Sequence, residues 1–196
     1  MDDHLIFEIK RKLVHLSSVI YILIYYFIET YFSQRTALLT LVFILVFLSF
    51  LEFLKMRYHN QIPFFHHLYR DNEKNNLSGS IYLILGVIIA FAIFDFDIAI
   101  TAILMMIVGD TASALMGRIG NHKIDGYRAS WEGVISEFLV DLAIGFIFLN
   151  NIPIIFIMSL TATFVETVLK PVDDNLAIPV VAGFAGQALM IIIKHI

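Results

Sequence analysis

The chain has 196 residues, of which 59% are apolar and only 15% are charged, with a formal net charge of −4 and no cysteine. Soluble proteins are roughly half apolar and about a quarter charged, so this composition excludes an ordinary soluble protein and indicates an integral membrane protein. The lack of cysteine excludes disulfides, thiolate metal sites and a cysteine nucleophile. The acids form no continuous face, so the net charge says little about partners, and we expect none among nucleic acids.

The apolar residues recur along the whole chain in stretches of about 20, the length that crosses a bilayer as a helix. They predict an all-α polytopic membrane bundle of about seven transmembrane helices, in a single domain that covers residues 1–196. The expected spans, in chain order, are 13–31, 36–54, 77–94, 98–116, 130–149, 153–169 and 176–193. The turns at 95–97 and 150–153 are short, so the helices that they join should be antiparallel neighbours.

The 13 Lys and Arg residues divide unequally between the two sides of these spans. Arg35 and Lys194 fall on one side and all the others on the opposite side. The positive-inside rule therefore predicts a cytoplasmic N-terminus, in a multi-pass protein of the cell membrane if the source is prokaryotic. The apolar stretch after Lys10-Arg11-Lys12 is longer than a signal-peptide core, so we expect it to be kept as the first span.

Asp110 lies inside an apolar run, about seven residues or roughly 10 Å from the cytoplasmic end of its span. Placing a carboxylate in hydrocarbon costs several kcal/mol unless another group compensates its charge. We therefore expect the Asp110 side chain to face a polar cavity, a cation or a polar partner. Glu132, Glu166, the run Asp173-Asp174-Asn175 and His15 are expected at the same membrane face. Four separate segments thus bring polar groups together, as a site open to cytosolic solutes requires.

Such a set of side chains suits the binding of a phosphate and a divalent metal. Mg²⁺ prefers carboxylate and water oxygens together with substrate phosphates, and Arg118, Lys123 and Arg128 in the adjoining loop would neutralise a polyphosphate. The glycines at 109, 117, 120, 126 and 133 permit close approach of the backbone, although small residues in spans also serve tight helix packing. The P-loop and other signatures of soluble phosphotransferases are absent.

Four sequence blocks follow one another in a specific order. They are Glu8-Ile9-Lys10-Arg11-Lys12-Leu13-Val14-His15, then Gly109-Asp110-Thr111-Ala112-Ser113 through Gly117-Arg118-Ile119-Gly120, then Arg128-Ala129-Ser130-Trp131-Glu132-Gly133, and finally Glu166 with Asp173-Asp174-Asn175-Leu176-Ala177-Ile178-Pro179. Together they resemble the CTP-dependent polyprenol kinase family, which includes dolichol kinase, phytol kinase and the CTP-dependent diacylglycerol kinase. One departure is Arg128, where the family usually has a lysine, and Ala129 separates it from Ser130.

The resemblance implies transfer of the γ-phosphoryl group of CTP to the hydroxyl of a lipid alcohol, with Mg²⁺ as cofactor. It implies Asp110 and Glu132 as Mg²⁺ ligands, and Glu166 or Asp174 as the group that orients or deprotonates the alcohol. Contacts to nucleotide or phosphate are implied for Lys12, His15, Gly109, Ser113, Gly117, Arg118, Gly120, Lys123, Arg128, Ser130, Gly133 and Asn175. Polyprenol, phytol, geranylgeraniol, dolichol and diacylglycerol all fit as the acceptor, and the oligomeric state stays open.

Several alternatives remain at this point. A CTP-dependent cytidylyltransferase acting on a lipid phosphate would use the same carboxylates, and an ion-coupled membrane transporter would also carry ionisable groups in its spans. Snorkelling at the interface would equally explain Lys12 and His15. Glu137 and Asp141 lie four residues apart on one face of the fifth span, where they either complete an acidic site or pair with polar residues such as Thr163.

Overall fold

The structure, a computed structural model, describes residues 11–57, 78–124, 129–169 and 172–195. Within these ranges it is helical, and its one extended pairing is an isolated antiparallel bridge between Lys123 and Ser130. The elements are α2 (Val19–Tyr31), α3 (Gln34–Arg57), α4 (Gly79–Ile93), α5 (Phe96–Leu104), a π-helical turn (Met105–Gly109), α6 (Asp110–Ile119), α7 (Trp131–Phe148), α8 (Ile152–Val168) and α9 (Asp174–Lys194).

The helical segments of the described residues correspond in order to the predicted spans. Four are long and apolar enough to cross a membrane, namely Arg11–Tyr31, Gln34–Leu54, Phe96–Ile119 and Asp174–Lys194, and two shorter apolar helices are Gly79–Ile93 and Ile152–Val168. The remaining helix, α7, has 18 residues and carries three acids along its length. The prediction of an all-helical membrane bundle is confirmed, while seven as the number of crossings stays a prediction.

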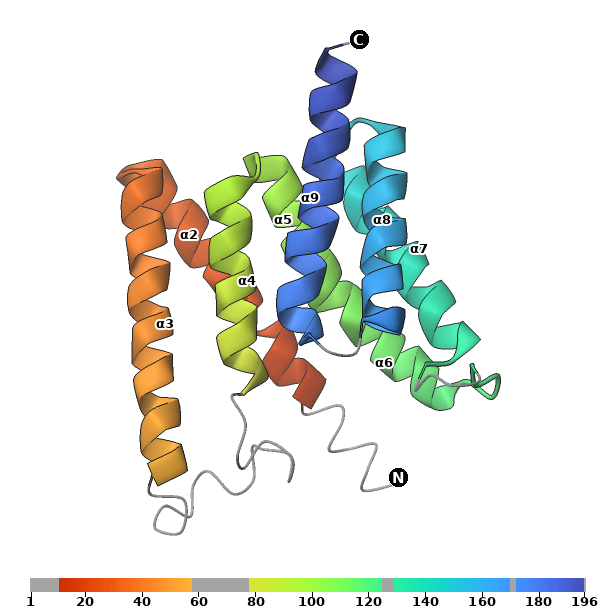
Figure 1. The fold of residues 1–196 in the computed structure, drawn as a ribbon, viewed down its shortest axis with the longest axis horizontal. Helices are drawn as coiled ribbons and strands as arrows, with labels where there is room; N and C mark the ends of the chain where they lie inside the picture. The colour runs from red at the N-terminus through yellow and green to blue at the C-terminus, as the bar shows by residue number, and fades with distance from the viewer. Residues whose placement is uncertain (1–10, 58–77, 125–128, 170–171, 196) are drawn as a thin grey trace.

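Helix α5, the π-turn and α6 form one continuous helix, and counted in this way successive helices alternate in direction, as the short turns predicted (Figure 1). The beginning of the first helix (Arg11–Tyr31, which contains α2), the end of α6 and the beginnings of α7 and α9 lie toward one end of the bundle, and the end of α9 lies at the other. Helix α9 packs against α4, α5 and α8, whereas α3 packs against α2 and α4 at the edge of the bundle. Segments distant in sequence therefore meet at the end where α9 begins.

The apolar core lies among α4, α5, α8 and α9, with side chains such as Phe91, Ile103, Met158 and Ile178 fully buried. In contrast, α2 and α3 expose large apolar side chains such as Phe27 and Phe43 along their outer faces, as expected of helices in contact with lipid. Buried polar side chains include Lys12, Asp110, Glu137 and Asp141. These buried ionisable groups locate the part of the bundle whose chemistry differs from ordinary packing.

Side-chain caps define where the later helices begin. The Ser130 hydroxyl accepts from the backbone N–H of Gly133 at 3.2 Å, and Asn151 Oδ1 accepts from that of Ile154 at 3.3 Å. Asp173 caps α9 by accepting from the backbone N–H of Asn175 at 3.1 Å. Each bond satisfies one N–H that a helix leaves without an internal partner. The caps therefore set the positions of Glu132, Glu166 and Asp174 relative to the helix ends.

Candidate functional site

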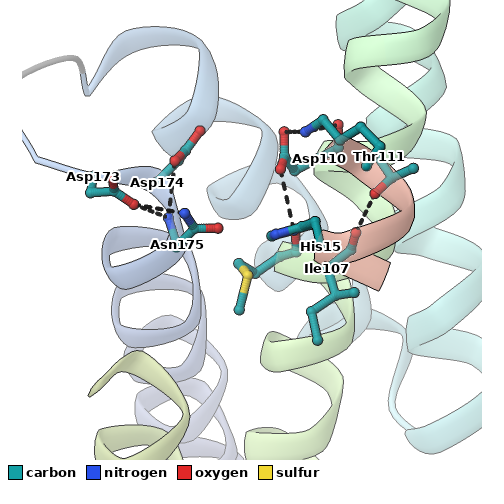
Figure 2. Close-up of polar contacts among 9 residues, drawn as sticks. His15, Ile107, Asp110, Thr111, Asp173, Asp174 and Asn175 are labelled. Atoms are coloured by element: carbon teal, nitrogen blue, oxygen red, sulfur yellow. Dashed lines mark hydrogen bonds and ion pairs between the residues drawn. The ribbon is translucent and has the colours of Figure 1, made fainter. Parts of the chain in front are cut away.

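Asp110 lies at the first position of α6, directly after the π-turn. A π-turn contains one more residue than an α-turn, so it changes which side chains share a face, and such turns occur frequently at functional sites. The Thr111 hydroxyl donates to the carbonyl of Ile107 at 2.7 Å inside this turn (Figure 2). The Asp110 residue is only 8% exposed, which confirms that its carboxylate is buried.

Two basic residues of the first helix engage the Asp110 carboxylate. Lys12 Nζ lies 2.5 Å from Asp110 Oδ1 and also donates to the Asp110 carbonyl at 3.2 Å. His15 Nε2 lies 3.3 Å from Asp110 Oδ2 and 3.4 Å from the Met106 carbonyl (Figure 2). Snorkelling is therefore the wrong explanation of Lys12, which is 2% exposed and reaches inward. The ion pair and its added hydrogen bonds offset part of the desolvation cost of both charges.

The beginning of α9 adds a further polar group beside Asp110. Asp173 Oδ1 accepts from the Asn175 side-chain amide at 2.9 Å, and Asp174 Oδ1 accepts from the Asn175 backbone N–H at 3.1 Å (Figure 2). The charges of Asp110 and Lys12 both act on Asp174. Burial first, and then the charge of Asp174, raises the pKa of Asp173 to about 6. Asp174 and Asn175 therefore lie on the Asp110 side of the bundle, as the sequence predicts.

A second set of carboxylates, which we call the α7–α8 acidic group, consists of Glu137, Asp141 and Glu166. Glu137 and Glu166 share a hydrogen bond, and Ser113 forms another with Glu166. A hydrogen bond between two carboxyl groups requires a proton on one of them. Four buried oxygens of the group have no hydrogen-bond partner in the described ranges, namely Glu137 Oε2, Glu166 Oε2 and both carboxylate oxygens of Asp141.

The Asp141 carboxylate lies directly against Gly109, the last residue of the π-turn, where a Cβ would collide with it. The sequence left open whether Asp141 pairs with a polar residue, and the structure gives its carboxylate no hydrogen-bond partner. Glu137 pairs with another acid rather than with a hydroxyl residue. The two acids absent from the predicted site are thus beside it, and their signal in the sequence was an i, i+4 acidic pair inside an apolar helix.

Glu132 lies apart from Asp110. Its Oε1 accepts from the backbone N–H groups of Asn121 and His122, at 3.0 Å and 3.2 Å, and lies 2.7 Å from His122 Nδ1. The same carboxylate lies against Gly120, at the other end of α6 from Asp110 and about 15 Å away at 1.5 Å per residue. The structure therefore does not bring Asp110 and Glu132 together as a pair of metal ligands, and Glu132 fastens the α6–α7 loop.

Other residues of the second and third blocks have packing partners. A Cβ on Gly133 would lie 3.0 Å from the Ser113 carbonyl oxygen and 3.1 Å from Gly117 Cα, so α6 and α7 cross in close contact there. Lys123 Nζ donates to the Gly117 carbonyl at 2.7 Å, which stabilises the C-terminal end of α6. Ser130 caps α7 through Gly133. In this arrangement these residues, which the sequence predicts as phosphate contacts, stabilise the packing of α6 and α7 and the ends of both helices.

The predicted residues therefore fall into two groups. One group surrounds Asp110, at the junction of the first helix, the π-turn, α8 and α9: Lys12, His15, Gly109, Ser113, Glu166, Asp174 and Asn175. The other lies around the α6–α7 loop: Gly117, Arg118, Gly120, Lys123, Ser130, Glu132 and Gly133. Arg128 lies outside the described residues. Among the described residues, no three Asp, Glu or His side chains alone are placed to enclose a metal ion.

The chain is similar to three curated proteins. It is 30% identical over 190 residues to the uncharacterised protein RP860 of Rickettsia prowazekii, covering 88% of this chain and 90% of that protein. It is 30% identical over 182 residues to the uncharacterised protein MJ1137 of Methanocaldococcus jannaschii, covering 90% and 91%. It is 27% identical over 151 residues to CTP-dependent diacylglycerol kinase 1 of Saccharomyces cerevisiae, covering 72% of this chain but 50% of the yeast protein. No family model and no solved structure matches the chain.

Proposed function

We propose that this chain, which belongs to the same family as RP860 of Rickettsia prowazekii and MJ1137 of Methanocaldococcus jannaschii, is a membrane-embedded kinase. The proposed reaction transfers the γ-phosphoryl group of CTP to a lipid alcohol. The observation that carries the proposal is the distant similarity to a CTP-dependent diacylglycerol kinase over 72% of the chain. A buried polar site at the junction of four helical segments supports it, because a lipid hydroxyl and a nucleotide must meet at the membrane.

The reaction joins the alcohol oxygen to the γ-phosphorus and breaks the bond from that phosphorus to the oxygen bridging the β-phosphate. CDP leaves with that oxygen, and the hydroxyl proton passes to a carboxylate of the protein. We assign the proton acceptor to Glu166 or Asp174, which lie on two different helices beside Asp110. Such a transfer depends chiefly on positioning and on stabilising charge.

Basic residues of the α6–α7 loop are the proposed phosphate contacts. Lys123 is exposed, and Arg118 lies in the last turn of α6. Arg128 is the third basic residue of this loop in the sequence. Its planar guanidinium group can bind two phosphate oxygens at once, whereas the ammonium group of the lysine usual in the family acts as a single point charge. Lys123 would exchange its bond to the Gly117 carbonyl for a bond to phosphate when the nucleotide binds.

The carboxylates around Asp110 have the donor chemistry that Mg²⁺ prefers, since they offer oxygen atoms and several of those oxygens are buried without a partner. When bound, Mg²⁺ neutralises phosphate charge during the transfer. Glu132 is fastened to the loop at His122. We therefore propose the metal at the Asp110 end of α6, with Glu132 as a residue that orders the loop.

We further propose that this end of the bundle faces the cytoplasm. The excess of Lys and Arg on one side of the expected spans supports that orientation through the positive-inside rule. It gives CTP access from the aqueous side, while a long apolar alcohol enters from the bilayer. Diacylglycerol, phytol, geranylgeraniol and polyprenols all have the required hydroxyl and form the panel for the assay.

The test uses purified protein in lipid nanodiscs with Mg²⁺, the acceptor panel, and CTP labelled on either the α- or the γ-phosphate. A lipid kinase transfers only the γ-label to lipid and releases CDP. Transfer of the α-label with release of pyrophosphate would contradict the proposal and identify a cytidylyltransferase. No labelled lipid with any acceptor, together with nucleotide-independent ion flux in proteoliposomes, would instead identify a transporter.

Asp110→Asn supplies the mutational arm of the same assay. Removing one hydrogen-bond donor from a preorganised transition-state site lowers the rate by about 10²- to 10³-fold, and we expect a loss of that order here because Asp110 holds Lys12 and His15 in place. Asp97→Asn is the matched control, because Asp97 is an exposed aspartate in the first turn of α5. Turnover close to wild type by a folded Asp110→Asn protein would contradict the assigned site.

A further inference from the structure

The buried carboxylates of this site differ in whether their oxygens are already engaged. Asp110 has Lys12 on one oxygen and His15 within 3.3 Å of the other. Asp141 is 0% exposed, yet neither of its oxygens has a hydrogen-bond partner among the residues that the structure describes. Glu137, one turn earlier on α7, is 1% exposed and its Oε2 is also without a partner. The buried oxygens available to a cation are therefore those of the α7–α8 acidic group rather than those of Asp110, and Asp141 is the member with both oxygens open.

The balance of charge around Asp110 also points to the acids of α7 as the residues that need a cation. Lys12 and His15 are committed to Asp110, and the bond between Glu137 and Glu166 accounts for one shared proton. Within the described part of the chain, that arrangement leaves the Asp141 carboxylate without a hydrogen-bond partner, and it leaves the Glu137–Glu166 pair with one negative charge. A buried, unpaired carboxylate is too costly to persist, so the group must take up either more protons or a cation.

The backbone places these oxygens at the site and not in a remote part of the fold. Gly109 has no side chain, and this lets the Asp141 carboxylate approach the π-turn directly before Asp110. Ser113, one turn further along α6, is bonded to Glu166 of the same acidic group. A ligand held by Asp141 would consequently lie beside the residues to which we assign phosphoryl transfer.

The number of protein ligands selects the class of cation. No three acidic or histidine side chains of the described residues can enclose a metal ion by themselves. Ca²⁺ requires six to eight oxygens and Zn²⁺ commonly three or four protein ligands, whereas Mg²⁺ is typically held by one or two carboxylates, with water and phosphate oxygens completing its shell. Two carboxylates one turn apart on α7 match the Mg²⁺ pattern.

We propose that Asp141 and Glu137 are the protein ligands of the divalent cation, and that Asp110 instead positions Lys12 and His15. The inference rests on the proposed function only for the phosphate that completes the shell of the ion. The binding of the cation to α7 stands on the carboxylates alone. It is therefore tested by metal binding, without turnover.

The experiment titrates Mn²⁺, as a paramagnetic substitute for Mg²⁺, into purified full-length protein in nanodiscs and measures free Mn²⁺ by electron paramagnetic resonance. Asp141→Asn and Glu137→Gln should each weaken Mn²⁺ binding by roughly 10- to 100-fold, since even residues that only support a metal ligand have effects of that size. Asp97→Asn, the exposed control, should match wild type. Asp110→Asn should weaken Mn²⁺ binding less than either of these two variants, because it removes no ligand.

Thermal unfolding of the same proteins gives a second readout. Without a divalent cation, Asp141→Asn should unfold at a higher temperature than wild type, because the substitution removes an unpaired carboxylate. Adding Mg²⁺ should raise the unfolding temperature of wild type and leave that of Asp141→Asn unchanged. If Asp141→Asn does not fold, Glu137→Gln carries the same comparison.

Two results would overturn the inference. One is Mn²⁺ binding by Asp141→Asn and Glu137→Gln equal to that of wild type, with the loss confined to Asp110→Asn, which would make Asp110 the ligand. The other is the absence of Mn²⁺ binding by wild type both with and without CTP, which would mean that protons compensate the acidic group. Wild-type protein that binds Mn²⁺ through Asp141 but phosphorylates no lipid would contradict the proposed function and leave this inference standing.

Discussion

Asp110 and Asp141 are buried carboxylates on either side of Gly109, and their surroundings are opposite. Asp110 is bonded to Lys12 and faces His15, so its charge is matched within the protein. Asp141 is more deeply buried, and none of the described residues forms a hydrogen bond to either of its oxygens. The first is a completed interaction that attaches the first helix to α6, and the second is incomplete without a proton or a ligand. Burial alone thus marks an unusual acid, whereas the state of its oxygens indicates what it does.

The largest expected effect follows from making Asp110 resemble Asp141. Lys12→Met leaves the Asp110 carboxylate buried with His15 alone, and removing one partner of a buried ion pair costs about 3–5 kcal/mol. The free energy of unfolding in detergent measures this loss. Lys12→Met combined with Asp110→Asn should recover most of it, because the double variant leaves no unpaired charge. A double variant as unstable as Lys12→Met would contradict the pairing.

The next effect comes from pushing Asp141 away from the π-turn. Gly109→Ala places a methyl group where the Asp141 carboxylate lies, and overpacking of this kind costs about 1–3 kcal/mol. Gly117→Ala is the matched control, since its Cβ would meet atoms at an ordinary 3.5 Å and alanine favours helix. Gly109→Ala should therefore unfold at a lower temperature than Gly117→Ala. Equal unfolding temperatures would argue against close contact between Asp141 and Gly109.

A smaller effect is expected for Glu132, a carboxylate that is paired but close to water. Glu132→Gln weakens the bonds to Asn121 and His122, so trypsin should cleave after Lys123 a few times faster than in wild type. Mn²⁺ affinity should be unchanged, as in the Asp97→Asn control. A loss of Mn²⁺ binding as large as that of Asp141→Asn would restore Glu132 as a metal ligand.

The smallest effect is expected for Asp173, because hydrogen bonds to Asn175 offset only part of the cost of burying its charge. Its pKa is raised to about 6 in the folded protein, so the protonated form favours folding and this contribution is lost as the pH rises through about 6. Asp173→Asn keeps an oxygen to cap α9 and carries no charge. The unfolding temperature of the variant should exceed that of wild type more at pH 7.5 than at pH 4.5, and a difference independent of pH would refute the assignment.

The helices were predictable because hydropathy and short turns leave little freedom in a membrane bundle. The expected span at 98–116 corresponds to the helix Phe96–Ile119, and that at 176–193 to α9. The π-turn at Met105–Gly109 was not predicted, because an i to i+5 bond leaves no mark in composition. The position of Asp110 around its helix axis therefore could not be derived from the apolar pattern.

The sequence predicted polar groups near one membrane face, but not which of them meet. Charge sorting predicts Asp110, Glu132 and Glu166 at one face of the membrane, and this depth stays a prediction; it gives no information on which helix contacts which. Glu132 proved to lie at the far end of α6 from Asp110, against Gly120. Asp141 proved to lie against Gly109. The packing of α6 on α7 decides which of these two acids lies close to Asp110, and that packing cannot be derived from the apolar pattern of a single sequence.

The π-turn has a consequence for how the chain can change in length. Because it holds one residue more than an α-turn, losing any one of residues 105–109 would let the helix close as a regular α-helix. The π-turn accommodates its extra residue by widening, so such a deletion would leave the helix on either side in nearly its present rotation, with Asp110 still facing Lys12. The same deletion further along, within α6, would rotate the residues that follow by about 100° relative to those before it. Residues 105–109 are therefore the part of this helix that should tolerate the loss of a single residue.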